Sequence, residues 1–310
     1  MAAMKILTTN GMASIQDLGR FGYRSMGVGR SGAMDHWALQ AGNALLKNER
    51  DEPAIELAMG ELTIQFEADV SFCLTGALYE AYLDNKRIPS YWRINAKAGQ
   101  TFKLLRPIEG MYAYLCVHGG FDIASILQSG STNLKAGFGG FNGRYLQADD
   151  RLKVKAPSSL PIIGVAPLAP TNTIRVIKSS EYDCFTSSAQ ADFVSQPWQL
   201  QTSSNRMGYR LAGELSLELT QPKEMSSHGV DMGMIQVPPQ GQPIVLMADG
   251  QTTGGYPKIA TVIDADIGLM AQIRFGKTCQ FTLVDRRQAH RARQNRQHYI
   301  DQIQEYGYEH

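Results

Sequence analysis

Apolar and polar residues alternate in several short segments of the chain. Residues 62–66, 215–219 and 279–283 each place an apolar side chain at every second position, as expected of strands with one buried face. Residues 112–117 and 243–247 are almost entirely apolar, which is typical of strands buried on both faces. Glycine and proline separate nearly all of these segments, and few helical patterns lie between them. The pattern therefore predicts a mainly β protein rather than a parallel α/β sheet.

Helices are expected at three places. Apolar side chains from Met34 to Leu45 recur at helical spacing, and a shorter helical pattern at residues 267–274 ends before Gly276, a residue that commonly terminates helices. Residues 285–306 carry five arginines before an acidic end. We interpret this last segment as a solvated amphipathic helix on the surface, rather than as a patch for nucleic acid or membrane.

The length of the chain and a weak internal repeat indicate two domains of one design. A chain of 310 residues corresponds to about two domains of ~150 residues. The sequence GELTI at residues 60–64 reappears as GELSL at residues 213–217, and the stretch 156–172 contains four prolines and no charged residue, as linkers do. We predict one domain at residues 1–165, a second at residues 170–284 and a helical tail at residues 285–310.

Composition excludes several classes of protein. Hydrophobic residues make up 43% and charged residues 19% of the chain, and the net charge is +1, so neither a disordered chain nor a general polyanion binder is expected. The first ten residues do not form a secretory signal, and no apolar stretch reaches the ~20 residues that span a bilayer. We therefore expect a cytoplasmic protein. The widely spaced cysteines are expected to be reduced core residues: Cys73, Cys116, Cys184 and Cys279.

Three common catalytic or metal-binding motifs are absent from the sequence. Gly276-Lys277-Thr278 is not a Walker motif, because Ala271 stands where the first glycine belongs and an alternating strand pattern follows. The six histidines include no i,i+4 pair and have no partner cysteines, so a structural zinc site is not expected. No G-x-S-x-G sequence provides a serine hydrolase nucleophile.

The best candidate for chemistry is the loop at residues 248–258. Its sequence, ADGQTTGGYPK, follows a predicted buried strand, and it offers backbone N–H groups, two threonine hydroxyls and a lysine to an anionic or carbonyl ligand. The alternative is a structural turn in which glycine supplies positive φ.

Other charged or polar residues have both structural and functional interpretations. In the stretch 204–210, Arg206 and Arg210 could hold a carboxylate or phosphate, or could cover the barrel surface. Asp17 and Arg20, three residues apart, favour a local ion pair. His118 ends a predicted buried strand, where a hydrogen-bonded turn histidine is favoured over a catalytic base.

Five segments of the chain resemble one protein family. They are QDLGRFG at residues 16–22, SGAMD at 31–35, LTGA at 74–77, the stretch 204–213, and the run 227–260 that contains IQVPP and QTTGGYPK. On these segments the chain resembles the allophanate hydrolase subunit 2 family, which comprises the A and B domains of biotin-dependent carboxyltransferases, and within it the KipA-like proteins of 5-oxoprolinases. It departs from the family at Ser179-Ser180, where members often have Gly-Pro before Glu-Tyr.

The resemblance implies two cyclophilin-like β-barrel domains and an enzyme of several subunits. A smaller related partner (the B subunit, KipI-like) and a third 5-oxoprolinase chain (the A subunit) would complete the ATP-dependent opening of 5-oxo-L-proline to L-glutamate. ATP, with Mg, would be shared between this chain and its partners. Because a lactam is an unreactive amide, phosphorylation of its carbonyl oxygen would explain the need for ATP.

The resemblance also implies roles for individual residues. Lys258, with the hydroxyls of Thr252 and Thr253, would stabilise negative charge, and Asp249 would orient a proton. The substrate would be held by the following residues, with Arg206 or Arg210 on its carboxylate: Arg206, Arg210, Gln251, Gly254, Gly255, Tyr256, Arg20 and His118.

Two other classes of function remain open. A carboxyltransferase acting on a urea-like substrate would use the same anion-stabilising loop and would require biotin on other chains. A KipA-like regulatory protein would bind its partner and catalyse nothing.

Overall fold

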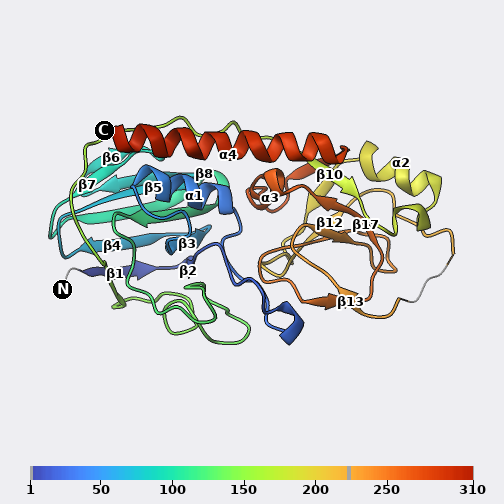
Figure 1. Ribbon diagram of the computed structural model, residues 1–310, viewed down its shortest axis with the longest axis horizontal. Coiled ribbons are helices and arrows are strands. Elements are labelled where there is room, and N and C mark those ends of the chain that lie inside the picture. The colour runs from blue at the N-terminus through green and yellow to red at the C-terminus, as the bar shows by residue number, and fades with distance from the viewer. Residues whose placement is uncertain (1–2, 222–224, 310) are drawn as a thin grey trace. The chain divides into compact units, whose positions relative to one another are not determined.

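The chain folds into two compact units of mainly β structure. The computed structural model describes residues 3–221 and 225–309 (Figure 1). Unit 1 consists of Met1–Arg20, Ser31–Leu168 and Gln297–His310, and unit 2 of Phe21–Arg30 and Ala169–Arg296. Each unit therefore combines segments that are far apart in the sequence.

Unit 1 is built on a nine-stranded sheet with the order β2-β3-β8-β4-β1-β9, in which β5 pairs with β6, β7 and β8 to form a half-barrel. Its strands are β1 (Ala3–Thr9), β2 (Met12–Gln16), β3 (Ala54–Ala58), β4 (Leu62–Phe66), β5 (Val70–Leu83), β6 (Lys86–Ile88), β7 (Ile94–Ala96), β8 (Thr101–Val117) and β9 (Arg151–Lys153). All of the pairings between these strands are antiparallel.

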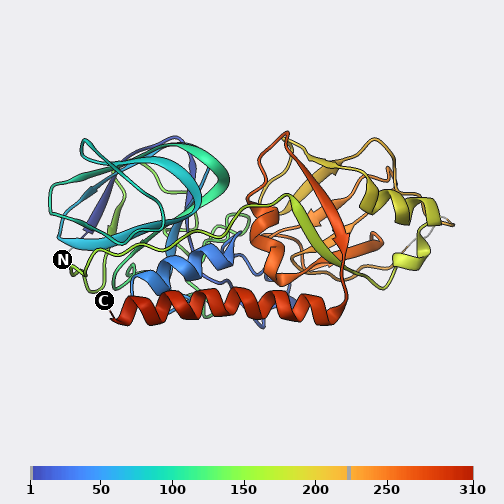
Figure 2. The same cartoon turned by 90° about the horizontal axis from the view of Figure 1, so that it is seen from above.

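The core of unit 1 follows from the sequence pattern. In β4 the apolar positions Leu62, Ile64 and Phe66 are fully buried, while Thr63 and Gln65 between them are not. The apolar end of β8 is buried at every residue from 111 to 117, because it has the sheet core on one face and α1 (His36–Leu45) on the other. Figure 2 shows this helix lying along the sheet.

Helix α1 is held closely against the sheet. Its N-cap residue Asp35 accepts a hydrogen bond from the Ala38 N–H at 3.1 Å, and all ten helical residues are buried. At Gly42 a Cβ atom would lie 2.6 Å from the Cys116 sulfur, so only glycine permits this approach. Cys73 lies opposite Cys116 in the sheet. The prediction of reduced cysteines is confirmed, with Cys184 alone not fully buried.

Unit 2 contains a closed barrel of strands in the order β10-β17-β14-β15-β12-β11-β18, with a separate two-stranded sheet of β13 and β16. The strands are β10 (Thr173–Lys178), β11 (Trp198–Leu200), β12 (Gly208–Ala212), β13 (His228–Gly229), β14 (Met234–Gln236), β15 (Ile244–Leu246), β16 (Thr253–Gly254), β17 (Lys258–Val262) and β18 (Thr278–Leu283). The pairing of β10 with β18 is parallel, and it closes the barrel. Phe193 stacks on Phe281 in its core, with ring centroids 4.8 Å apart.

The mainly β prediction is confirmed, and the closed barrel occurs in unit 2. The helices are α1, α2 (Ser187–Ser195), α3 (Ile267–Ala271) and α4 (Arg286–Glu309), with short 3₁₀ segments η1 (Arg24–Met26), η2 (Tyr182–Cys184) and η3 (Asp264–Asp266). Three of the helices match the sequence pattern, whereas α2 was not predicted. It begins after Thr186, whose hydroxyl caps it by accepting from the Ala189 N–H at 3.1 Å.

The strand predicted at residues 215–219 is wrong. These residues form no strand, apart from an isolated bridge between Leu219 and Phe185. The Leu215 N–H instead donates to the Gln196 side chain at 3.0 Å, and the Leu217 N–H donates to the Gly241 carbonyl at 2.9 Å. The apolar residues alternate as in a strand, but a side-chain oxygen and a backbone carbonyl from elsewhere in unit 2 accept these hydrogen bonds in place of a neighbouring strand.

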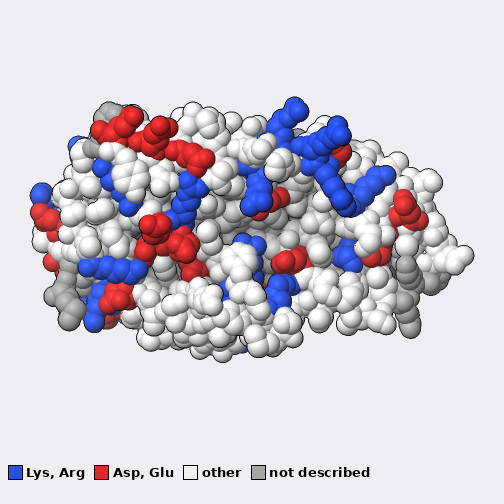
Figure 3. Space-filling view, viewed as in Figure 1, with Lys and Arg blue, Asp and Glu red and all other residues white. Residues whose placement is uncertain are grey.

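Helix α4 is amphipathic and mostly polar. Ala292 packs against Ile263 and Ala265 in unit 2, and within unit 1 Arg50 pairs with Asp301 at 2.6 Å. Figure 3 shows Lys and Arg side chains gathered over the first half of the helix. Among the described residues, no helix has the length and apolar character needed to cross a membrane.

Candidate functional site

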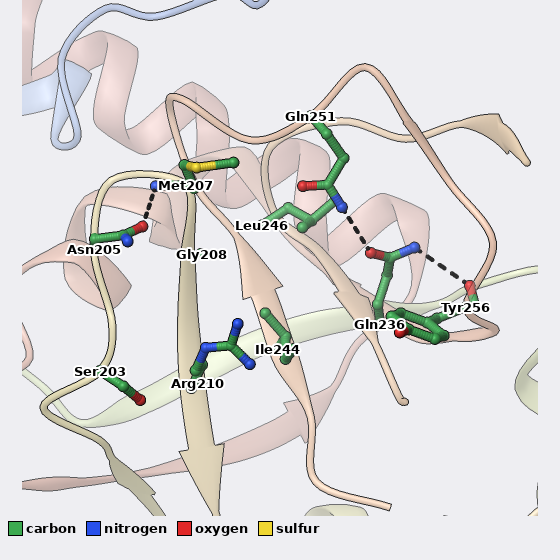
Figure 4. A pocket seen from close by; sticks show the side chains of 10 residues that line it. All are labelled: Ser203, Asn205, Met207, Gly208, Arg210, Gln236, Ile244, Leu246, Gln251 and Tyr256. Carbon is green, nitrogen blue, oxygen red and sulfur yellow. Dashed lines mark hydrogen bonds between the residues drawn. The ribbon is translucent and has the colours of Figure 1, made fainter. Parts of the chain in front are cut away.

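A small pocket in unit 2 collects several of the predicted site residues. Its volume is about 230 Å³, and its lining comprises Ser203, Asn205, Met207, Gly208, Arg210, Gln236, Ile244, Leu246, Gln251 and Tyr256 (Figure 4). Arg210, Gln251 and Tyr256 were expected to contact substrate. Of the residues expected to contact substrate, the pocket therefore brings together Arg210 of β12 and two residues of the 248–258 loop, Gln251 and Tyr256.

Side-chain amides lie on one side of this pocket. Gln236, at the end of β14, is 2% exposed. Its Nε2 donates to the Tyr256 carbonyl at 3.4 Å, and its Oε1 accepts from Gln251 Nε2 at 3.3 Å. Figure 4 shows this chain of amides facing the pocket, with the guanidinium of Arg210 directed toward Ile244. An arginine and two glutamine amides offer a site for a small molecule with a carboxylate and an amide.

The glycines of the loop do not have the positive φ that the structural alternative for this segment required. Gly250, Gly254 and Gly255 are not among the residues with positive φ, so the interpretation of a turn that requires left-handed glycine is wrong. Gly254 lies in β16, where a Cβ atom would be 2.5 Å from Gln236 Nε2. Gly255 similarly lies close to the Met225 carbonyl, which a Cβ would approach to 3.1 Å. These glycines permit close packing around the amide pair.

Lys258 is the first residue of β17, and its side chain is buried within a polar cluster. Its Nζ lies 2.9 Å from Glu181 Oε2 and contacts His228 Nε2. The side chains of Lys258 and Glu181 are only 7% and 10% exposed. In the barrel register Lys258 is opposite Gln236, which lines the pocket. The cluster therefore adjoins the pocket through a neighbouring strand.

Glu181 is held in its ionised form. Burial raises the pKa of this carboxyl, but hydrogen bonds from Ser180 and Lys258 outweigh burial, so that its pKa lies below the ordinary value. The Ser180 hydroxyl donates to Oε1 at 2.5 Å, and the Lys258 backbone N–H donates to Oε2 at 3.1 Å. Ser180 thus holds Glu181 through its side-chain hydroxyl.

Arg206 and Asp249 pair with each other. Arg206 Nε lies 2.8 Å from Asp249 Oδ2 and Nη2 lies 3.1 Å from Oδ1, and the two side chains are 9% and 12% exposed. The Asp249 N–H also donates to the Arg206 carbonyl at 2.8 Å. A two-point pair of this kind fixes the start of the loop relative to the 204–210 turn.

The two threonines lie on the outer part of the loop. The Thr252 carbonyl accepts from the Val230 N–H at 3.1 Å, and Thr253 is exposed in β16. Arg24 supports the same region, because it pairs with Asp231 at 3.3 Å and donates to the Gln251 carbonyl at 3.4 Å. The predicted catalytic roles of both threonines stay predictions.

Arg20 and His118 belong to unit 1 and not to the unit that contains the pocket. Arg20 is 1% exposed, donates to the Ile126 carbonyl at 3.1 Å and lies over the Phe138 ring at 4.7 Å. Its expected neighbour Asp17 accepts instead from Ser129, Ser131 and Gly130. His118 Nδ1 lies 2.7 Å from the Leu46 carbonyl. These contacts are those of residues that fix loops and a helix end.

Sequence reasoning missed Glu181, His228 and Gln236. Each is distant in sequence from the residue that it contacts: Glu181 and Lys258 are 77 residues apart, and His228 and Lys258 are 30 apart. The one available signal was the departure from the family at Ser179-Ser180, directly before Glu181. In the part of the chain that the structure describes, no group of three or more His, Cys, Asp or Glu side chains is arranged to hold a metal ion.

The fold and the pocket define a protein with a closed β-barrel and a small pocket in unit 2, one strand away from a buried, ion-paired lysine. The model of the family described as carboxyltransferase domain, subdomain A and B, matches residues 26–283. The chain belongs to this carboxyltransferase family.

Curated relatives cover nearly the whole chain. It is 50% identical over 299 residues to the C subunit of the Haemophilus influenzae 5-oxoprolinase, a match that covers 96% of each chain. It is 44% identical to the C subunit of the Escherichia coli 5-oxoprolinase, covering 97% of each. Among solved structures, the urea amidolyase of K. lactis matches with a TM-score of 0.89 and 26% identity over 97% of this chain and 20% of that one.

Proposed function

We propose that this chain is the C subunit of an ATP-dependent 5-oxoprolinase, the enzyme that opens 5-oxo-L-proline to L-glutamate. The observation that carries this proposal is 50% identity to the C subunit of a 5-oxoprolinase along 96% of both chains. A match of this extent includes both units as well as the pocket. On this proposal the chain contributes a substrate site and acts only with its partner subunits.

Arg210 is the residue that we assign to the substrate carboxylate. Sequence reasoning left Arg206 and Arg210 as equal candidates. Arg206 is bound by Asp249 through two hydrogen bonds, whereas Arg210 is exposed and lines the pocket. A planar guanidinium suits a carboxylate because it donates two parallel hydrogen bonds.

The amides of Gln236 and Gln251 suit the lactam of 5-oxoproline. A lactam presents one N–H donor and one C=O acceptor, and each glutamine side chain presents both kinds of group. Gln251 Nε2 already donates to Gln236 Oε1 at 3.3 Å, which fixes the orientation of both amides. Lys258, opposite Gln236 in the sheet, would provide positive charge near the lactam carbonyl as negative charge develops there.

The pocket is small for a nucleotide. Its volume of about 230 Å³ lies below the ~300–1,000 Å³ of most ligand pockets, so it suits one small ring and not ATP beside it. We therefore place ATP and Mg mainly on the partner subunits and derive no step of this chain from them. When bound there, ATP would supply phosphorylation of the lactam oxygen.

We also propose the arrangement of domains and partners that the sequence led us to expect. Residues 1–165 and 170–284 would form most of two cyclophilin-like domains, a half-barrel and a closed barrel, followed by a tail at 285–310. The compact units add residues 21–30 to the second domain and divide the tail at residue 297. The partners would be a smaller related chain (the B subunit) and a third chain (the A subunit). The assembly would lie in the cytoplasm. Both bacterial relatives are the C subunits of 5-oxoprolinases, which supports a multi-subunit enzyme.

The experiment that tests the function is reconstitution. The purified chain alone, and the chain co-purified with its two partner subunits, are assayed for glutamate release from 5-oxoproline with ATP. We expect turnover in the complex and little or none in the isolated chain. Arg210→Ala should raise KM for 5-oxoproline about 10- to 150-fold, the worth of a charged hydrogen bond, while the exposed Arg287→Ala on α4 should match the parent. Absence of turnover in an intact complex would exclude the proposal.

A urea-directed carboxyltransferase is the second candidate. The TM-score of 0.89 to a urea amidolyase favours it, although this chain covers only 20% of that protein. It predicts activity that depends on carboxybiotin and not on 5-oxoproline. A regulatory, KipA-like role predicts binding of the smaller partner without turnover of either substrate.

A further inference from the structure

The polar groups around the Lys258 amine form a network in which the ammonium meets two acceptors, Glu181 Oε2 and His228 Nε2. The Ser226 carbonyl, 3.1 Å from His228 Nδ1, can only accept, so that Nδ1 carries the proton. In the neutral ring Nε2 is then an acceptor, and it faces the Lys258 ammonium, which can only donate. The tautomer of His228 is therefore determined by its two neighbours.

Glu181 binds Lys258 at two points. Its Oε2 receives both the side-chain Nζ at 2.9 Å and the backbone N–H at 3.1 Å. Its Oε1 is occupied by the Ser180 hydroxyl at 2.5 Å, so the carboxylate cannot rotate without losing a hydrogen bond. One oxygen thus holds both ends of the lysine residue.

We propose that Glu181 and His228 are positioning residues, which hold the Lys258 ammonium at one place beside the pocket, Glu181 by charge and His228 as a neutral acceptor. The location of this network is independent of the proposed function, whereas its effect on turnover rests on that function. The side chains of Glu181 and His228 form their hydrogen bonds with Ser180, Ser226 and Lys258, none of which lines the pocket. Both act through Lys258.

The network is also joined to the amides of the pocket. His228 pairs with Gly254 between β13 and β16, and Gly254 lies directly against the Gln236 side chain. Gln236 in turn is opposite Lys258 between β14 and β17. The loop, Lys258 and the amides of Gln236 and Gln251 are therefore in mutual contact. A displacement of Lys258 would be transmitted to these amides through Gln236, its neighbour in the sheet.

Chemical labelling of lysines tests the positions without any assay of turnover. The folded chain is treated with a limiting amount of acetic anhydride, and mass spectrometry gives the labelling rate of Lys258 relative to the exposed Lys277 of the same chain. Glu181→Gln removes the charge that stabilises the ammonium and should raise the relative rate about tenfold. Glu181→Asp keeps the charge and should give a smaller increase. The exposed Glu214→Gln should equal the parent.

Variants of His228 separate its acceptor from its volume. In His228→Gln the side-chain carbonyl can take the place of Nε2 as an acceptor, and relative labelling of Lys258 should stay within about twofold of the parent. His228→Leu has no acceptor and should raise it several-fold. Circular dichroism and thermal melting confirm the fold of each variant. Equal labelling of Lys258 in the parent, Glu181→Gln and His228→Leu, all folded, would overturn the proposal.

Steady-state kinetics of the reconstituted complex test the effect on turnover. Glu181→Gln and His228→Leu should lower kcat roughly 10- to 100-fold, as residues that orient a functional group do, with KM for 5-oxoproline little changed because Arg210 remains. His228→Gln should recover most of the activity. Altered labelling with unchanged kcat would refute the positioning role, whereas a parent complex without turnover would refute the proposed function and leave the labelling result standing.

Discussion

Replacement of Asp249 by asparagine tests whether the Arg206–Asp249 pair is structural. The two side chains are joined by hydrogen bonds of 2.8 and 3.1 Å and are 9% and 12% exposed. Asparagine keeps the shape of the side chain and one acceptor oxygen but removes the charge. The Arg206 guanidinium, which is mostly buried, then loses the negative charge of Asp249.

The expected loss of stability follows from this geometry. Removing one partner of a buried ion pair costs about 3–5 kcal/mol. Because both side chains keep some contact with water and asparagine keeps one acceptor, we expect the lower end, about 3 kcal/mol. With a urea m-value of ~2 kcal/mol/M this lowers the unfolding midpoint by roughly 1.5 M, and it lowers the melting temperature by roughly 10 °C.

Fluorescence of Trp198 provides the assay. Trp198 is fully buried and is the only tryptophan of unit 2, since Trp37 and Trp92 lie in unit 1. In a Trp37→Phe, Trp92→Phe background, urea unfolding of unit 2 is followed for Asp249→Asn, Arg206→Met and the double variant. The coupling between the two sites should be about 1–3 kcal/mol.

A matched control is Asp183→Asn, an exposed aspartate of the same unit, which should change the free energy of unfolding by less than about 0.5 kcal/mol. If Asp249→Asn keeps the parental midpoint while turnover of the complex falls 100-fold or more, the structural reasoning is refuted. Asp249 would then have the proton-orienting role that the sequence suggested.

Two further predictions concern the residues around Lys258. Gly254→Ala should displace the Gln236 side chain, since the new Cβ would lie 2.5 Å from Gln236 Nε2. We expect a higher KM for 5-oxoproline with a nearly unchanged melting temperature. Gly229→Ala, whose Cβ meets nothing within 4 Å, serves as the control in both measurements. Because the pKa of Glu181 is lowered in the folded chain, its stabilisation is complete above the ordinary pKa of ~4.3 and is lost as pH falls through the lower folded value. The stability difference between the parent and Glu181→Gln, measured by urea unfolding, should therefore shrink as the pH falls below about 5; a difference constant with pH would contradict the ion pair.

Local patterns predicted those elements whose burial is decided by their own sequence. The alternation at residues 62–66 and 279–283 became β4 and β18, and the helical spacing from Met34 became α1. The same alternation failed at residues 215–219, where Gln196 and Gly241 satisfy the backbone. The alternation of apolar residues indicates which face of a segment is buried, but it does not determine whether a neighbouring strand is present to pair with that segment.

The sequence singled out two short segments of the candidate site, the 204–210 stretch with Arg210 and the 248–258 loop. The 248–258 loop, which the sequence singled out, supplies Gln251 and Tyr256 to the pocket and Lys258 to the neighbouring cluster. The structural alternative for its glycines was wrong, since Gly254 makes room for Gln236 and does not supply positive φ. The partners of Lys258 come from two other segments of unit 2. No local pattern identifies them, because only the tertiary fold brings Glu181, which follows β10, and His228, in the separate sheet of β13 and β16, to the same amine.

The fold of unit 2 also explains why a lysine can stand at this position. A buried ammonium is costly unless it is paired and hydrogen-bonded, and Lys258 meets the Glu181 carboxylate and His228 Nε2, the latter from the separate sheet of β13 and β16. In the barrel itself, Lys258 is the first residue of β17. The barrel register sets Gln236 opposite Lys258. Strands that stabilise the barrel through their pairing thus also determine the distance between the buried charge and the amides, so a change of register in β14 or β17 would disrupt the fold and the site together.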